Sequence, residues 1–226
     1  MKYNLDMREA GFFALRKPKT LTSALTTLLL FTSLSTAGEL KELSIIEEDD
    51  EYRLRIVMIM DSSADYVYRV ITDYKHLYRI HPSVTESEIL PSPDNESVRL
   101  RNRFEYCIAL SCFDIDWVED IKELQDGYLK ADTVPELSDF ESGTAIWGVQ
   151  PHGEHARITY QSQMKPDFFI PPLIGNMIMK YRLREEAITT FTRIECHATI
   201  LSTKEAIMND PAQLAAFLKG GGGCAG

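Results

Sequence analysis

The stretch that decides the fold is IPPLIGNMIMKYRLREEAITTFTRIECHATIL, residues 170–201. Apolar side chains recur in it at steps of three and four, which places them on one face of an α-helix. They are Ile174, Met177, Ile178, Tyr181, Ile188, Phe191, Ile194, Ala198 and Leu201. With Pro171 and Pro172 in its first turn, the spacing predicts one helix on the order of 45 Å long.

The other face of this expected helix is charged, so only the apolar face can be buried. Its charged residues are Lys180, Arg182, Arg184, Glu185, Glu186 and Arg193. A single apolar face of this length needs a large apolar surface to pack on. We therefore look for a sheet in the preceding residues.

Those residues alternate between apolar and polar in short runs, the pattern typical of half-buried strands. We expect strands at 52–60, 84–90, 97–108, 111–124, 128–133, 138–150 and 155–164. Between the first two, residues 61–82 are expected to form two small helices, with Ser62 as the N-cap of the first. The order predicts an α+β fold in which one long helix lies on a curved antiparallel sheet of about seven strands.

Residues 1–37 have the composition of a leader. Basic residues are followed by an uncharged run at 21–34 and by the small residues Ser35-Thr36-Ala37. This order predicts a secretory signal peptide cleaved after Ala37, and hence export to a periplasm or secretion. The alternative is a retained membrane anchor, for which the uncharged run is slightly short.

Without residues 1–37 the chain is strongly acidic. Removing them takes away 5 of 24 basic and 2 of 34 acidic residues. The remaining 19 basic and 32 acidic residues give a formal net charge of −13. This charge argues against a nucleic-acid partner and against electrostatic docking on anionic lipid, because both need clustered Lys and Arg.

Two cysteines flank an expected hairpin turn at residues 109–110. A two-residue turn places Cys107 opposite Cys112 and Arg103 opposite Asp116, although it also pairs Glu105 with an aspartate. Exported proteins can keep disulfides, so we predict a Cys107–Cys112 bridge, with two free thiols as the alternative. Cys196, on the long helix, is expected to be a buried apolar residue.

Residues 202–226 form a tail beyond the expected domain, which spans 38–201. A short helix is expected at 206–218, followed by the flexible run Gly220–Gly223. No role is assigned to Cys224.

Two segments resemble the START-like (SRPBCC) superfamily of polyketide cyclases, coenzyme Q-binding proteins and lipid-transfer proteins. VITDYKHL, residues 70–77, is similar to the v-l-t-D-Y-e-n-L segment that follows the first helix in this group. Residues 160–173, with Pro166, Phe168, Ile170 and Pro171, resemble the entry into the C-terminal helix. The resemblance covers roughly residues 42–201 and implies the helix-grip fold, with a deep apolar cavity that holds lipids, quinones, sterols or polyketides.

The implied cavity would be walled by aromatic and apolar side chains of the sheet and the long helix. We expect its lining to include Tyr106, Trp117, Trp147, Tyr160, Met177, Tyr181 and Ile188. We expect its rim to be Leu77, Tyr78, Phe168 and Phe169, where a ligand enters and the protein touches a membrane transiently by hydrophobic insertion. The alternative for both groups is ordinary core packing.

No catalytic or metal-binding motif is recognised. The sequence contains no G-x-S-x-G, no H-E-x-x-H and no glycine-rich phosphate loop. His152, Glu154 and His155 are close together, but they fall on a Pro-Gly turn that is expected to be solvated. We expect neither a metal nor a cofactor.

Three functions follow from these expectations. The first is an exported, non-enzymatic protein that binds a hydrophobic small molecule. The second is a cyclase- or hydrolase-like enzyme of the same fold, with Glu119 or Tyr160 as the candidate acid or base. The third is an interaction module with a solid core, and the presence or absence of a cavity distinguishes it from the other two.

Overall fold

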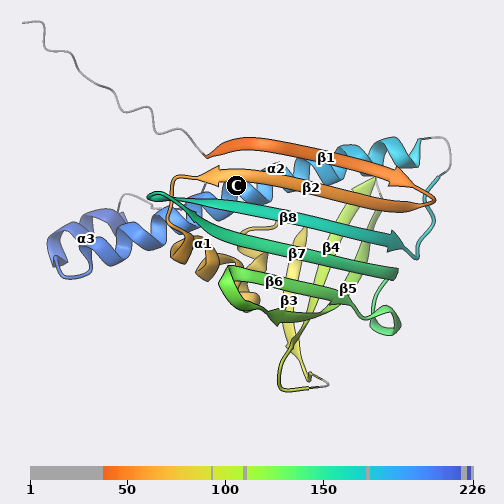
Figure 1. Cartoon of the computed structure of the whole chain (residues 1–226), viewed down its shortest axis with the longest axis horizontal. Helices are drawn as coiled ribbons and strands as arrows, with labels where there is room; N and C mark the ends of the chain where they lie inside the picture. The colour runs from red at the N-terminus through yellow and green to blue at the C-terminus, as the bar shows by residue number, and fades with distance from the viewer. Residues whose placement is uncertain (1–37, 93, 109–110, 172–173, 220–222, 225–226) are drawn as a thin grey trace, which may run out of the picture. The chain divides into compact units, whose positions relative to one another are not determined.

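The computed structural model describes residues 38–226 except 93, 109–110, 172–173, 220–222 and 225–226 (Figure 1). The expected signal peptide, residues 1–37, lies outside the described residues. One antiparallel sheet of eight strands has the order β1-β2-β8-β7-β6-β5-β4-β3. The strands are β1 (Glu39–Glu48), β2 (Glu51–Met60), β3 (Val84–Leu90), β4 (Val98–Ile108), β5 (Ser111–Glu123), β6 (Tyr128–Thr133), β7 (Phe140–His152) and β8 (His155–Pro166).

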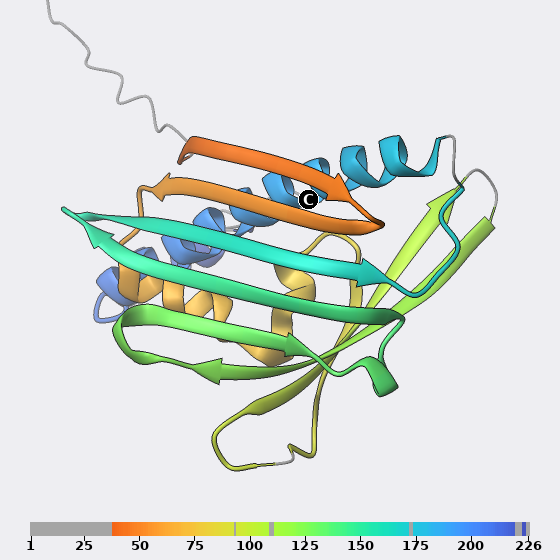
Figure 2. The ribbon, with the colours of Figure 1, turned by 45° about the vertical axis from the view of Figure 1, so that its right-hand side comes forward.

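The described part of the chain contains six helices, of which the longest lies along one face of this curved sheet. They are α1 (Ala64–Ile71), α2 (Gly175–Ile207), α3 (Pro211–Lys219) and the short 3-10 helices η1 (Tyr74–Arg79), η2 (Gln125–Gly127) and η3 (Pro135–Leu137). Figures 1 and 2 show α2 running along the sheet behind β1, β2 and β8, with α1 on the same side. The α+β, helix-grip architecture is confirmed. No helix in the described part of the chain is long and apolar enough to cross a membrane.

The seven expected strands are all present, with ends within two residues of the predicted ones. An eighth strand, β1, was missed because its alternation is weak. Leu40 and Ile46 point apolar side chains into solvent with 42% and 54% exposure. Pairing with β2 holds β1 in place at the edge of the sheet, and Arg55 of β2 donates to Glu42 at 2.9 Å.

The long helix differs from the prediction at both ends. It begins at Gly175, so Pro171 precedes it, and Pro172 lies outside the described residues. A Cβ on Gly175 would come within 2.4 Å of the Ile170 side chain, which shows how tightly the chain turns into the helix. The helix then continues past Leu201 to Ile207, because residues 202–207 contain no glycine or proline to stop it.

The predicted register of the β4–β5 hairpin is confirmed. Cys107 lies opposite Cys112, and Arg103 lies opposite Asp116, which it binds with two parallel hydrogen bonds of 3.0 Å. Cys112 is disulfide-bonded. The Cys107 side chain and the turn at 109–110 lie outside the described residues, so the pairing of these two cysteines stays a prediction.

A second disulfide corrects the expectation for Cys196. This residue is bonded to Cys224, which is 28 positions further along the sequence, with 5.8 Å between the two Cα atoms. The bond ties the end of the chain back to α2, and so gives Cys224 a structural role.

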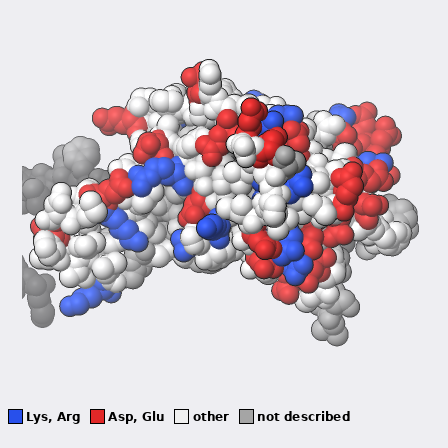
Figure 3. All heavy atoms as spheres, turned by 90° about the horizontal axis from the view of Figure 1, so that it is seen from below, with Lys and Arg blue, Asp and Glu red and all other residues white. Residues whose placement is uncertain are grey.

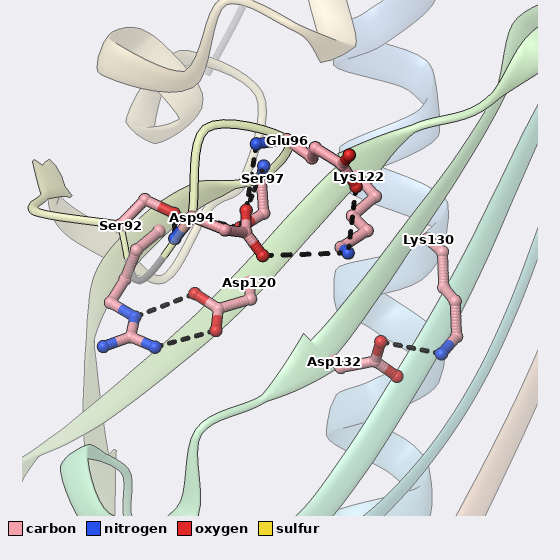
Figure 4. Close-up of polar contacts among 9 residues, drawn as sticks. Ser92, Asp94, Glu96, Ser97, Asp120, Lys122, Lys130 and Asp132 are labelled. Carbon is pink, nitrogen blue, oxygen red and sulfur yellow. Dashed lines mark hydrogen bonds and ion pairs between the residues drawn. The ribbon is translucent and has the colours of Figure 1, made fainter.

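The outer face of β4, β5 and β6 carries ion pairs in place of apolar side chains (Figure 4). Lys122 lies 3.8 Å from Asp94 and 3.9 Å from Glu96, and Lys130 lies 2.7 Å from Asp132. These pairs are largely exposed, so each contributes about 1 kcal/mol or less to stability. Ile115 and Trp117 of β5 point to the opposite face, whereas Val118 is buried on the outer one.

Candidate ligand-binding site

A cavity of about 240 Å³ lies between the sheet, α2 and η1. Alternation along the strands positions its walls, because every second side chain of a strand points to the same face. On β5 these side chains are Phe113, Ile115, Trp117, Glu119 and Ile121. The cavity contradicts the expectation of a solid-core interaction module.

Four of the expected lining residues are brought together at the cavity. They are Tyr106, Trp117, Trp147 and Tyr160, and all come from the sheet. Trp147 and Tyr160 pack with 4.3 Å between ring centroids, and Phe191 of α2 stacks on Trp147 at 5.7 Å. The wall is therefore an apolar, largely aromatic surface shared by strands and helix.

The three lining residues expected from α2 are misplaced. Met177 and Tyr181 are 68% and 60% exposed, and Ile188 is half-buried but does not line the cavity. The inward positions recur at steps of four instead, and they include both Arg182 and Glu186. The helical face was mispredicted because these two charged residues were assigned to solvent.

The expected rim separates into two inward and two outward residues. Leu77 and Phe168 line the cavity, and Phe168 packs edge-on against Phe140 at 5.8 Å. Tyr78 and Phe169 are 44% and 82% exposed and do not line it. The adjacent phenylalanines thus point in different directions, one into the protein and one into solvent.

Glu119 places a carboxyl group in the apolar wall. Burial, together with the nearby charge of Asp132, raises the pKa of Glu119 to about 7. No hydrogen bond or ion pair to its side chain is found among the residues that the structure describes. Burial and the Glu119 charge also raise the pKa of Tyr160, so its phenol stays protonated at neutral pH.

A second carboxylate, Glu186, lines the cavity and is well supplied with donors. Its two oxygens accept hydrogen bonds from Ser83 at 2.7 Å and from Tyr106 at 2.8 Å. His81 Nε2 lies 3.6 Å away, but burial and the charge of Arg193 lower the pKa of His81 to about 4. The imidazole is therefore neutral at pH 7 and forms no ion pair there.

Sequence reasoning missed the Glu186 cluster. It placed Glu186 on the solvent face of the helix. No local pattern marks this residue, because its partners come from β4 and from the segment before β3. Among the described residues, no group of three His, Cys, Asp or Glu side chains is arranged to hold a metal ion.

No protein-family model matches the sequence, and no curated protein matches it. Solved structures do match. The Zhui aromatase/cyclase from Streptomyces sp. R1128 superimposes with a TM-score of 0.55 at 11% identity, covering 66% of this chain and 94% of that chain.

Two further matches are START proteins. A STAR-related lipid transfer protein from Xanthomonas axonopodis gives a TM-score of 0.51 at 17% identity, covering 70% of this chain and 98% of its own. A START superfamily protein from Mycobacterium smegmatis gives 0.51 at 14% identity, with 63% and 97% covered. The coenzyme Q-binding subtype stays a prediction. The chain has the helix-grip fold of the START superfamily.

Proposed function

We propose that this protein binds a hydrophobic small molecule in the cavity between the sheet and α2. The observation that carries the proposal is the 240 Å³ cavity with its aromatic wall. Each Å² of apolar surface that a bound ligand removes from water contributes about 25 cal/mol to the free energy of binding. Enclosed apolar pockets with few polar groups are the usual form of a small-molecule site.

The matched folds support this proposal. One structure is named as a lipid transfer protein and another as an aromatase/cyclase. The specific ligand is left open by this likeness, since the identities are below 20%.

Native mass spectrometry of the protein purified from its host, followed by lipid extraction, tests the proposal directly. We expect a bound mass that is released by organic solvent. A complementary titration uses the neutral, apolar fluorophore N-phenyl-1-naphthylamine. A protein that carries no small molecule from its host and leaves this fluorophore unbound would contradict the proposal.

A matched pair of variants locates the site. Ala145 lines the cavity, so Ala145→Phe should fill it and abolish fluorophore binding. Ile146, the next residue on β7, points to the opposite face of the sheet, so Ile146→Phe should leave binding unchanged. Equal loss in both variants would place the fluorophore elsewhere or indicate a folding defect, which the melting temperatures would reveal.

A second candidate function, acid–base catalysis, rests on Glu119. A carboxyl group with a pKa near 7 that faces a cavity can both donate and accept a proton at neutral pH. The test is to incubate the host-extracted ligand with the protein and follow its mass, for example for loss of water. Turnover by the wild type that Glu119→Gln abolishes would support an enzyme. An unchanged ligand mass would contradict catalysis and leave ligand binding as the remaining function.

We also propose that the protein is exported. The leader-like composition of residues 1–37 supports this, as does the Cys196–Cys224 bond, because disulfides persist in oxidising compartments. Cell fractionation with N-terminal sequencing tests it. The expected mature protein begins at Gly38 and is absent from the cytosol.

A further inference from the structure

The two carboxyl groups of the cavity lie toward different ends of it. Strand β5 carries both reference points, with Phe113 opposite Tyr106 and Glu119 opposite Leu100. Phe113 and Glu119 are six positions apart on this strand, so about 20 Å of strand separates their Cα atoms. Tyr106 donates to Glu186, so the Glu186 cluster marks the Phe113 end and Glu119 lies well along the strand from it.

These two carboxyl groups differ in how their hydrogen-bonding capacity is used. Glu186 already accepts from two hydroxyl groups, at 2.7 and 2.8 Å. Glu119 has no such partner in the described part of the chain, and its neighbours in the sheet are Leu100 and Thr133. Glu119 is half-buried and is not among the fully enclosed polar groups that lack a partner, so its carboxyl group opens onto the cavity, where a ligand can supply the partner.

The charges around Glu119 decide what the partner must be. Burial, with a smaller effect from Asp132 on the outer face of the sheet, raises the pKa of Glu119 to about 7. A protonated carboxyl group offers one donor and an acceptor oxygen, which suits a hydroxyl or carbonyl group. An anionic partner beside Glu119 would be repelled by the ionised fraction of Glu119, and the cation of the cavity lining, Arg182, acts on Glu186 instead.

We propose, resting on the proposed function, that Glu119 anchors the ligand and that the ligand carries an uncharged oxygen on an otherwise apolar body. The oxygen is that of a hydroxyl or a carbonyl group. Hydrocarbons leave Glu119 unpartnered, and carboxylates place two negative charges together. The cavity therefore prefers alcohols, phenols and ketones over hydrocarbons and over fatty-acid-like anions of the same shape.

Three compounds with one ring system test this selectivity: naphthalene, 2-naphthol and 2-naphthoate. We expect calorimetry at pH 6 to show 2-naphthol binding about tenfold tighter than naphthalene, the gain from one buried hydrogen bond. Naphthoate should bind weaker than both. In Glu119→Leu the affinities for naphthol and naphthalene should become equal, while naphthalene binds at least as well as before.

Glu119→Gln is the matched variant, because it keeps the volume and the hydrogen-bonding capacity but removes the charge. It should retain the naphthol preference and bind naphthoate better than the wild type at pH 8, a readout that stands even if Glu119→Leu fails to fold. Equal binding of naphthol and naphthalene by the wild type, or an unchanged naphthoate affinity in Glu119→Gln, would overturn the anchor alone. Failure of all three compounds to bind would overturn the proposed function as well.

Discussion

Glu119 makes the stability of the folded protein depend on pH. Its pKa is about 7 in the folded chain against a usual value of 4.5, so the unfolded chain loses this proton first as the pH rises. Protonated Glu119 therefore makes its whole contribution to the free energy of unfolding below pH 4.5. This contribution is lost as the pH rises through 7. The total change from this one group is about 3 kcal/mol.

Glu119→Gln should remove this dependence, because glutamine does not titrate. Urea unfolding of wild type and variant at pH 5 and pH 8 checks the prediction. The wild type should lose more stability than the variant between the two pH values, and their difference cancels the other titrating groups. Parallel losses would show that the Glu119 pKa is close to normal.

Individual site residues could be predicted from the sequence only where the strand pattern fixes their direction. Trp117 and Tyr160 lie on strands of regular alternation, and both line the cavity. Glu119 was named as a candidate acid or base, but its inward direction was not deduced, although it has the same parity as Trp117. The inward position of Glu186 depends on Ser83 and Tyr106, which are distant in sequence.

At the scale of elements, α1 is held at its N-terminal end by a side chain of α2. Glu195 accepts hydrogen bonds from the backbone N–H groups of Asp61 at 3.0 Å and Ser62 at 3.2 Å. Ser62, expected to cap α1, is not the N-cap; Ser63 occupies that position and makes no side-chain cap. A carboxylate beside a helix N-terminus is also favoured by the helix dipole.

Glu195→Ala should therefore destabilise the protein by about 1–3 kcal/mol, since one buried and one partly buried N–H group lose their acceptor. Denaturant unfolding measures this loss, and hydrogen exchange should show faster exchange in α1 than in the sheet. Glu185→Ala on the exposed face of the same helix is the control and should change stability little. Equal effects in the two variants would mean that Glu195 does not hold α1.

Element boundaries were predictable where the signal is local. The alternation within each strand gave the limits of the β4–β5 hairpin, and the expected two-residue turn gave its register, in which Arg103 lies opposite Asp116. The missed β1 is an edge strand with exposed apolar residues, so pairing with β2 defines it better than its own pattern does. The face of α2 that points inward is determined by its packing against the rest of the protein. The spacing of apolar residues along the helix does not predict this face.

On the scale of the whole molecule, both charged and large apolar side chains are exposed. On the face drawn in Figure 3, acidic side chains gather mainly toward the right, with basic side chains among them and uncharged surface between, and the chain from residue 38 onward has a net charge of −13. Phe169, Met177 and Tyr181 are among the most exposed large apolar side chains, and all lie at or just before the start of α2. The cavity wall reaches this region through Phe168 and Ile178.

We propose that this end of α2 contacts a membrane transiently by hydrophobic insertion. Exposed apolar side chains beside a cavity provide such a contact, and a strongly acidic chain gains nothing from anionic lipid. Phe169→Ser combined with Met177→Ser should slow transfer of N-phenyl-1-naphthylamine from the protein to phosphatidylcholine vesicles severalfold. Salt should have little influence on the rate.

The melting temperature separates this contact from core packing. It should hardly change in the Phe169 and Met177 variant, because both side chains are mostly exposed. Phe168→Ser should lower it, because Phe168 packs against Phe140. Leu218→Ser on α3, at the far end of α2, removes an apolar side chain that is 62% exposed and should leave transfer unchanged. Transfer that Leu218→Ser slows equally would show that general surface hydrophobicity, and not this end of α2, governs exchange with the membrane.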